Sequence, residues 1–370
     1  MRRLAKLAAA VCLAAALLPS PALAIDTQPE LTESTAACVT DASGRVLFDY
    51  NAEEEMPMAS ITKIMTAMVA LDSGKSLDDP VPIVENAFQE DAQLAGYKAG
   101  DTPSFRELLE VMLVFSGNDA AANVALATAG SEQAFVDLMN QKAAAIGMTH
   151  THFANPHGLE QDGHYSCAAD LCLMGRYALE HYPFIREAVR TREVQAFAGG
   201  NLITLGSTDE LMEYYDGLIG IKTGLTEAGA SFLGAARRDH VTLYSCSLCC
   251  ETGEGRFVDS ASMLDWGFGL YNQRQLTRQG WVRSVPWQDG FWLRCSVAPL
   301  RDATGSFFCE GDASYKLVGV KPNAFVGPGS TYGTSTWTQD GRQVQSVEYR
   351  VGGVPVRSKA WNPVVAPLFS

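Results

Sequence analysis

The chain has 370 residues, of which 47% are hydrophobic and 19% charged, and its formal net charge is -14. This composition is typical of a globular protein, and the length is enough for two or three domains of about 100–200 residues each. The acidic balance argues against a nucleic-acid-binding protein, because such proteins present a basic face and no dense run of Lys and Arg follows residue 6.

The first 24 residues are typical of an export signal. A basic start, MRRLAK, precedes an apolar stretch over residues 7–18, and "ALA" at residues 22–24 offers small side chains for cleavage. The apolar stretch is shorter than the ~20 residues that a membrane-spanning helix needs. We therefore expect an exported protein that is cleaved near Ala24, begins near Ile25 and works outside the cytoplasm, either secreted or associated with the cell wall.

Hydrophobic periodicity gives residues 25–272 strand-rich ends and a helical middle. Apolar alternation on both sides of a Ser43-Gly44 turn predicts a hairpin, and a helix is expected to begin at Ser60. Helical spacing of apolar residues predicts further helices over residues 104–115, 131–147, 167–182 and 255–270. Strands are predicted over residues 217–224 and, in two halves, 231–248. This arrangement favours an α+β fold, an antiparallel sheet flanked by helices with an inserted helical cluster.

A domain boundary is expected near Asn272, where the pattern changes to short strands. These strands are predicted over residues 291–298, 314–320, 334–338 and 342–351. Turn signals separate them, including Asp340-Gly341. Residues 273–370 are therefore predicted to form a small C-terminal all-β domain.

A polar pair, Ser60 and Lys63, opens a stretch that is otherwise almost wholly apolar, MASITKIMTAMVAL. Residues three apart share one face of a helix, so the two side chains can meet. A serine hydroxyl becomes a good nucleophile only when a neighbouring group takes its proton, and a desolvated lysine can do so because burial disfavours its charged form. The same pair could also be a helix cap beside a lysine that reaches solvent, since S-x-x-K occurs often by chance.

Two further motifs favour the catalytic interpretation of this pair. Ser116-Gly117-Asn118 follows an apolar helix, and Lys222-Thr223-Gly224 ends a strand. The order S-x-x-K, S-x-N, K-T-G is the signature of penicillin-binding proteins and serine β-lactamases, and each motif lies in the expected context. Three motifs in the right order and context are much less probable by chance than one.

The sequence also resembles the D-alanyl-D-alanine carboxypeptidases among the low-molecular-mass penicillin-binding proteins, serine peptidase family S11. The segments MASITKIMTA, SGNDAAN, HYSCAADL and GIKTGLTEAGASFLG are similar to segments of that family in the same order. The resemblance covers roughly residues 35–270 and extends to the β-rich tail by position and composition. The family usually has Asp where Glu160 stands and Thr where Cys167 stands.

The resemblance implies a penicillin-sensitive serine carboxypeptidase that removes the terminal D-alanine from peptidoglycan stem peptides ending in D-Ala-D-Ala. Ser60 would be the acylated nucleophile, Lys63 its proton acceptor and Ser116 a proton relay toward the leaving amine. For substrate binding, Asn118 would hold the peptide backbone.

The K-T-G strand would then recognise the end of the substrate. Lys222, Thr223 and Gly224 would bind its terminal carboxylate, since a cation and a hydroxyl suit an anionic group. The backbone N–H groups of Ser60 and Leu225 would form the oxyanion hole. β-Lactam antibiotics would act as covalent inhibitors, and no cofactor or metal is implied.

Three other interpretations remain open from the sequence. A serine β-lactamase shares the motifs, and Glu160 and Asp162 lie in the region where such an enzyme needs a base. A zinc carboxypeptidase would need clustered ligands, but the histidines between residues 150 and 164 lack H-E-x-x-H spacing, and the single C-x-x-C at Cys246 is a weak signal. The third interpretation is a non-catalytic protein that binds penicillin or the cell wall.

The C-terminal segment bears on membrane attachment. Glycines and prolines interrupt the last 22 residues, YRVGGVPVRSKAWNPVVAPLFS, and apolar residues do not recur there at helical spacing. An amphipathic membrane helix is therefore not expected in the mature chain.

Overall fold

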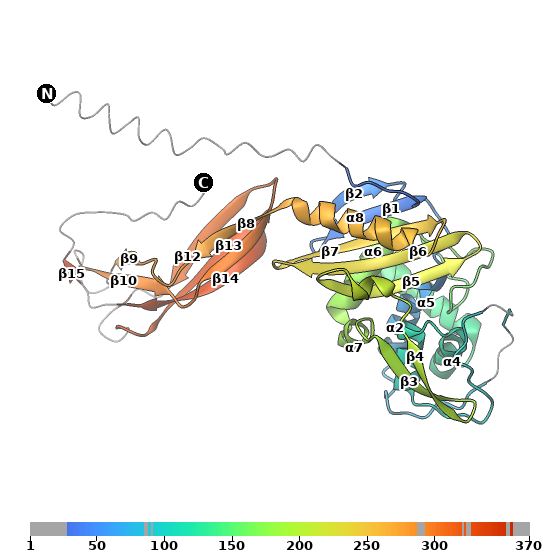
Figure 1. Cartoon of the computed structure of the whole chain (residues 1–370). Helices are drawn as coiled ribbons and strands as arrows, with labels where there is room; N and C mark the ends of the chain where they lie inside the picture. The colour runs from blue at the N-terminus through green and yellow to red at the C-terminus, as the bar shows by residue number, and fades with distance from the viewer. Residues whose placement is uncertain are drawn as a thin grey trace. The chain divides into compact units, whose positions relative to one another are not determined.

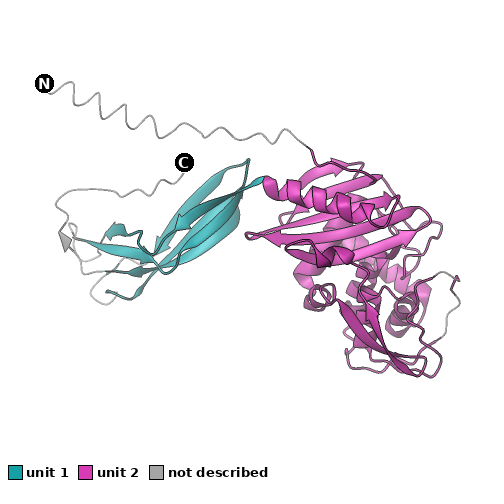
Figure 2. Ribbon diagram, viewed as in Figure 1, with its two compact units in different colours: residues 1–26, 270–370 teal, residues 27–269 magenta. Residues whose placement is uncertain are grey.

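The structure, a computed structural model, describes residues 28–84, 88–89, 92–286, 293–319, 322, 327–352 and 356–357. The predicted export signal and the last residues of the tail, 358–370, lie outside these ranges. The chain divides into two compact units, residues 27–269 and the residues from 270 onward (Figure 2). Within the described ranges, none of the helices has the length and apolar character that crossing a membrane requires.

The first unit combines an antiparallel sheet with a cluster of helices (Figure 1). Its helices are η2 (Ala59–Ile61), α2 (Thr62–Asp72), α3 (Phe105–Val114), α4 (Asn118–Ala129), α5 (Glu132–Ile146), α6 (Ala168–His181), α7 (Pro183–Ala188), η3 (Glu210–Glu213) and α8 (Gly255–Gly269). Its strands are β1 (Ala36–Asp41), β2 (Val46–Tyr50), β3 (Glu193–Ala198), β4 (Asn201–Gly206), β5 (Leu218–Thr226), β6 (Gly229–Arg238) and β7 (Val241–Cys250).

The five-stranded sheet has the order β2-β1-β7-β6-β5, with antiparallel neighbours throughout. Successive side chains of a strand point to opposite faces, so β1 serves two layers. Cys38 packs into the main core with α6, whereas Val39 packs beneath α8 beside Met263. The sheet therefore lies between α8 on one face and α6 with the helical cluster on the other. β5 forms the edge of the sheet.

The helical cluster holds the largest part of the core. In α2 every residue from 62 to 70 is buried, including Lys63. Helices α3, α5 and α6 each begin with a side chain that accepts a hydrogen bond from a backbone amide of the first turn. The Ser104 hydroxyl accepts a hydrogen bond from the Glu107 amide at the start of α3, and Gly147 ends α5 with a φ of 91°. Local signals and burial thus agree along this segment.

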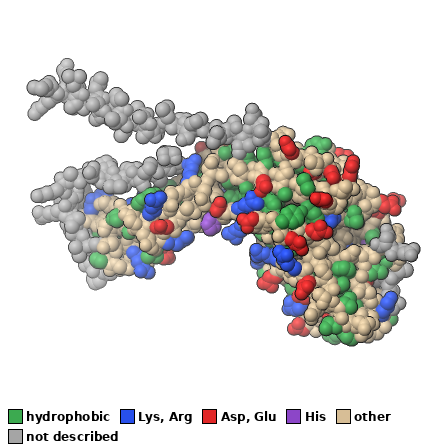
Figure 3. All heavy atoms as spheres, in the orientation of Figure 1, with side chains coloured by type: hydrophobic (Ala, Val, Ile, Leu, Met, Phe, Trp, Pro, Cys, Tyr) green, Lys and Arg blue, Asp and Glu red, His purple; other side chains and the backbone are tan. Residues whose placement is uncertain are grey.

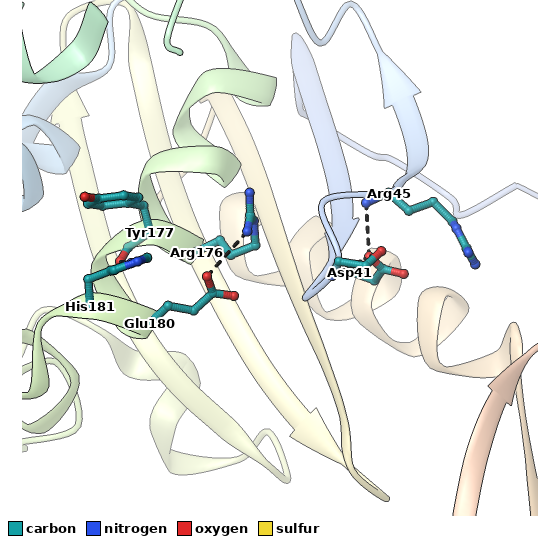
Figure 4. A network of polar contacts seen from close by, with 7 residues as sticks. Asp41, Arg45, Arg176, Tyr177, Glu180 and His181 are labelled. Atoms are coloured by element: carbon teal, nitrogen blue, oxygen red, sulfur yellow. Dashed lines mark hydrogen bonds and ion pairs between the residues drawn. The ribbon is translucent and has the colours of Figure 1, made fainter. Parts of the chain in front are cut away.

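A polar network lies where α6 meets the β1–β2 turn (Figure 4). The Arg176 guanidinium pairs with Glu180 at 3.4 Å and lies close to Gly44, where a Cβ atom would stand 3.4 Å from it. Within the turn, the Arg45 amide donates to the Asp41 carboxylate at 3.0 Å. The network orders the edge of the sheet opposite to β5, away from the K-T-G strand.

The second unit is built from strands. These are β8 (Tyr271–Thr277), β9 (Arg283–Pro286), β10 (Leu293–Pro299), β11 (Ala303–Phe308), β12 (Ala313–Gly319), β13 (Thr331–Gln339), β14 (Arg342–Val351) and β15 (Val356–Arg357). One sheet has the order β12-β13-β14-β10-β15, with β9 added to β10, and β8 pairs with β11. The core of the second unit contains Phe307, Trp337 and Tyr349.

The predicted α+β class and the all-β second part agree with this architecture. Several elements were not predicted, among them α4, α7, β8, β9 and β11. Residues 193–206, for which no element was predicted, form the β3–β4 hairpin around Gly199-Gly200. Ser60 does not begin an α-helix directly, because it lies in the short 3-10 helix η2 that precedes α2.

Candidate functional site: a serine–lysine centre

The backbone around Ser60 is held in an unusual conformation by two glycines. Ala59 has a φ of +51°, which is rare for a residue with a side chain. Any Cβ on Gly158 would lie 2.0 Å from the Ala59 carbonyl oxygen, and one on Gly224 would lie 2.7 Å from the Ala59 Cβ. The Ala59–Ser60 peptide is thus clamped between the loop after α5 and strand β5, which fixes the direction of the Ser60 side chain.

Lys63 is fully buried and all its hydrogen bonds converge on the site. Its Nζ donates to Ser60 Oγ at 2.7 Å, to Asn118 Oδ1 at 2.7 Å and to the His157 carbonyl oxygen at 2.6 Å. Burial, aided by the positive charge of Lys222, lowers the pKa of Lys63 well below its usual value. Because burial favours the neutral form of this amine, Lys63 is suited to accept the Ser60 proton.

The S-x-N motif lies between α3 and α4. Ser116 has a φ of +72°, and its hydroxyl lines the cleft without a hydrogen-bond partner in the described part of the chain. Asn118 begins α4, and its backbone N–H donates to the Gln93 carbonyl at 2.8 Å. The positive φ of Ser116 is a strained backbone conformation, and such strain is common where a side chain must be held in one position for function.

The K-T-G motif lies on the edge strand β5. Thr223 exchanges a 2.5 Å hydrogen bond with the Thr208 hydroxyl, and the Gly224 carbonyl accepts one from Arg256 Nη1 at 2.8 Å. Leu225 is 70% exposed next to the cleft. Because β5 has a strand partner on one side only, its other side is available to hold an extended peptide by strand addition.

These three motifs meet at one open cleft of about 570 Å³. Its lining includes Ser60, Ser116, Asn118, Thr223, Gly224, Leu225, Glu160, Thr208 and Arg256. Two residues of the predicted site lie beneath the surface of the cleft: Lys63 is 0% and Lys222 1% exposed. The structure therefore brings together every predicted site residue, with the two lysines behind the wall that the serines and Thr223 form.

Sequence reasoning missed Arg256, the basic side chain among the described residues that line the cleft. It comes from α8, and its Nε is buried without a hydrogen-bond partner in the described ranges. No local sequence motif predicts this residue, because it lies more than 30 positions after Gly224. Thr208 and Asp209 were missed as well, because the hairpin that carries the chain toward them was not recognised.

Among the described residues, His157, His164 and Cys167 have environments that suit structural functions. The pKa of His157 falls to about 3 and that of His164 to about 4, chiefly because both rings are buried. Cys167 caps α6 by accepting a hydrogen bond from the Asp170 amide at 3.4 Å, the position where the family usually has Thr.

One group of possible metal ligands occurs in the described part of the chain: His150, Cys167 and Asp170 lie with their donor atoms within 4.8 Å of one another. The Asp170 Oδ2 atom already accepts hydrogen bonds from the His150 amide and the Thr151 hydroxyl. Burial raises the pKa of the Cys167 thiol to about 12, which disfavours the thiolate that a metal needs. The donor set thus has structural functions of its own.

Acidic and basic side chains are interspersed over the visible face of the first unit (Figure 3). The net charge of -14 is therefore not gathered into a single acidic field on that face. A site that recognises an anion must then depend on local cations such as Arg256 and Lys222.

Comparison with known proteins identifies the family. Residues 23–251 match the family model Peptidase_S11, D-alanyl-D-alanine carboxypeptidase. The chain is 30% identical over 250 residues to the D-alanyl-D-alanine carboxypeptidase DacF of Bacillus subtilis, an alignment that covers 66% of this chain and 64% of the relative. It is 32% identical over 254 residues to DacA of Escherichia coli, covering 66% and 62%.

A solved structure extends the likeness to the second unit. Penicillin-binding protein 5 from Haemophilus influenzae is similar with a TM-score of 0.64 and 25% sequence identity, covering 89% of this chain and 99% of that one. The alignments with DacF and DacA span less than two thirds of those relatives' own lengths. The match of the family model to more than half of the chain shows that this protein belongs to the S11 family of D-alanyl-D-alanine carboxypeptidases.

Proposed function

We propose that this protein removes the terminal D-alanine from peptidoglycan stem peptides that end in D-Ala-D-Ala, through an acyl-enzyme on Ser60. The observation that carries the proposal is the position of the Lys63 Nζ, 2.7 Å from Ser60 Oγ, in a fully buried environment that lowers the pKa of the amine. A nucleophile within hydrogen-bond reach of a desolvated base is the arrangement that acyl transfer requires.

The reaction has two halves. In the first, neutral Lys63 takes the Ser60 proton while Oγ attacks the carbonyl carbon of the penultimate D-alanine. The backbone N–H groups of Ser60 and Leu225 stabilise the oxyanion, and Ser116 passes a proton to the leaving D-alanine amine. In the second half, water attacks the ester, and the shortened peptide leaves with a new carboxylate while Ser60 regains its proton.

Substrate binding uses the cleft between α4 and β5. The Asn118 Oδ1 atom accepts from Lys63, which leaves its side-chain nitrogen to hold the substrate backbone. Thr223, Gly224 and Arg256 line the end of the cleft that would take the terminal carboxylate, and Lys222 adds positive charge from beneath. A β-lactam, which also bears a carboxylate beside a reactive carbonyl, would acylate Ser60 and block it.

The proposal includes export. The substrate lies outside the cytoplasm, so the protein must be translocated, and the basic and apolar pattern of residues 1–24 supplies a reason to expect this. We further propose that residues 25–272 form the peptidase domain and residues 273–370 a small β-rich domain.

The proposed function is tested by D-alanine release. The purified protein is incubated with a diacetylated L-Lys-D-Ala-D-Ala peptide, and free D-alanine is measured for the wild type, Ser60→Ala and the control Ser76→Ala, which removes an exposed hydroxyl. We expect release from the wild type and the control, inhibition by benzylpenicillin and none by a chelator. Many turnovers of benzylpenicillin would indicate a β-lactamase, and chelator sensitivity a metallopeptidase. A wild type that releases no D-alanine would contradict the proposal.

A further inference from the structure

A second pair of buried ionisable groups lies behind β5, apart from Ser60 and Lys63. Lys222 is 1% and Asp209 7% exposed, and both line a small enclosed space with Thr208 and Thr223. This space is too small to admit a water molecule. Because water does not fill this space, a charge interaction between the two groups is screened less than it would be at the surface.

Hydrogen bonding in this space is incomplete on both sides. Asp209 Oδ1 accepts from the Leu211 amide at 3.1 Å, whereas Oδ2 is buried without a partner within the described residues. Lys222 Nζ donates to the Thr223 carbonyl at 3.1 Å, the acceptor that the described structure provides for its three N–H groups. An unpaired carboxylate oxygen and an under-used ammonium in one enclosure are costly unless their charges interact.

The surrounding charges make Asp209 the counter-charge for this part of the site. The positive charge of Arg256 on α8 lowers the pKa of Lys222, and the charge of Lys222 in turn lowers the pKa of Lys63 on α2. Glu210, next along the chain, acts on Arg256. Of the groups that act on Lys222, Asp209 is the one that favours its protonated form. The remaining residues around the enclosure are apolar or carry hydroxyl groups.

Backbone connection links this pair to the cleft. Thr208 directly precedes Asp209 and shares a 2.5 Å hydrogen bond with Thr223, the residue after Lys222. The two segments therefore contact each other through hydroxyls at the wall of the cleft, and below that contact their charged residues, Asp209 and Lys222, line the same space. A change in the charge of Asp209 would therefore alter the electrostatic potential where the carboxylate of a substrate binds.

We propose that Asp209 is a positioning residue for anion recognition: its carboxylate keeps Lys222 protonated beneath Thr223, and so sets the pH range in which the cleft accepts substrates with a free terminal carboxylate. The inference rests on the proposed function, because it assigns a purpose to the same site. It predicts selectivity for anionic chain ends that is lost when Lys222 loses its proton.

The titration of these groups supports the geometry. Burial, with Arg256 second, lowers the pKa of Lys222 to about 7, against the opposing effect of Asp209. Burial raises the pKa of Asp209 to about 7, against the hydrogen bonds from Leu211 and Met212 and the charge of Lys222. Removing the carboxylate removes the influence that raises the pKa of Lys222, so the ammonium should lose its proton at a lower pH.

The test compares the wild type with Asp209→Asn, which keeps the side-chain oxygen that caps Leu211 but cannot carry charge. In protein labelled with ¹³C at lysine Cε, the chemical shift of Lys222 is followed from pH 5 to 11. We expect its midpoint to fall by about one pH unit in Asp209→Asn, the scale of a single nearby charge. Asp209→Glu should restore most of the shift, and the exposed control Asp216→Asn should change nothing.

Kinetics supply a second readout. In Asp209→Asn, KM should rise for the peptide with a free carboxylate above pH 7, with kcat little changed, and the alkaline limb of kcat/KM should move to lower pH. An amidated analogue should show no such movement. A residue that only caps η3 would instead leave the pH profile in place, because Asn also caps, and an unmoved profile would overturn the inference.

The inference and the proposed function fail in different ways. If the wild type releases no D-alanine, the proposed function is wrong, but the Lys222 titration can still be measured. If release is normal and the Lys222 midpoint is the same in Asp209→Asn, the inference is wrong. Should Asp209→Asn fail to fold, Asp209→Ser serves as the neutral variant, because a serine hydroxyl can also cap η3, and an unchanged Lys222 midpoint in Asp209→Ser would overturn the inference.

Discussion

The region around Lys63 and the region around Lys222 begin from the same physical situation and use it differently. Both ammonium groups are buried and both have lowered pKa values because of that burial. Lys63 has three short contacts, to Ser60, Asn118 and a carbonyl, whereas Lys222 has one hydrogen bond and a carboxylate nearby. Burial alone therefore does not make a lysine a base.

The contacts decide the difference between the two regions. A lysine whose donors converge on a nucleophile is arranged for proton transfer at that atom. A lysine without a nucleophile in contact acts through its charge, which reaches the cleft from behind Thr223. Substitutions in the two regions should accordingly change different kinetic constants.

The largest effect is expected from Lys63→Met, which keeps an apolar side chain in the core. Without a proton acceptor, acylation of Ser60 by benzylpenicillin should slow by about 10²–10⁴-fold, the usual contribution of general base catalysis. Stopped-flow measurement of acylation checks this. The control is the exposed residue Lys98, as Lys98→Met, which should acylate normally. Acylation of Lys63→Met at the wild-type rate would show that another group takes the proton.

A smaller loss is expected from Gly158→Ala, which tests the clamp on the nucleophile. The new Cβ would meet the Ala59 carbonyl and displace Ser60, and a displacement of about 1 Å costs roughly 10²-fold in rate. Gly147→Ala is the matched control, because its φ of 91° equals the 92° of Gly158 within a degree and no atom lies within 4 Å of its Cβ.

Both glycine variants should lose stability through left-handed strain, by about 1–2 kcal/mol. Thermal or denaturant unfolding measures the loss of stability that the two variants share. Acylation kinetics measure the additional effect on Ser60 that only Gly158→Ala should have. If Gly147→Ala slows acylation as much as Gly158→Ala does, the effect comes from general strain and the clamp has no special importance.

Selectivity for a free terminal carboxylate tests the region around Lys222. Arg256→Met should raise KM for the peptide with a free carboxylate. If one charged hydrogen bond is lost, the binding free energy should weaken by about 1.5–3 kcal/mol. Lys222→Ala should act in the same direction more weakly, since this residue lies behind the wall of the cleft. Both variants should affect an amidated analogue much less, and the exposed control Arg190→Met should affect neither substrate. Equal losses on both substrates would mean that the two cations have another function.

The sequence predicted those parts of the site that local motifs carry. Ser60, Lys63, Ser116, Asn118 and the K-T-G strand were assigned to the site because each motif lies at a helix start, after a helix or at a strand end. Helix boundaries were also predicted well where capping residues such as Ser104 and Gly147 mark them.

Long-range partners could not be predicted in the same way. Arg256 and Asp209 reach the site from α8 and from the loop after β4, and nothing in their local sequence distinguishes them from surface residues. The His157 carbonyl that accepts a hydrogen bond from Lys63 is a backbone group without a residue-specific signal. The β3–β4 hairpin, which was not predicted, does have a local signal, because apolar residues alternate on both sides of Gly199-Gly200.

The most direct test of the account is the mass of the protein after reaction with benzylpenicillin, followed by peptide mapping of the adduct. The account predicts one penicilloyl group per chain, on the peptide that contains Ser60, with no adduct in Ser60→Ala and normal labelling in the control Ser76→Ala. Circular dichroism should show that Ser60→Ala remains folded. A stable adduct on a folded Ser60→Ala protein, or an adduct mapped to Ser116 in the wild type, would contradict the assignment of Ser60 as the nucleophile.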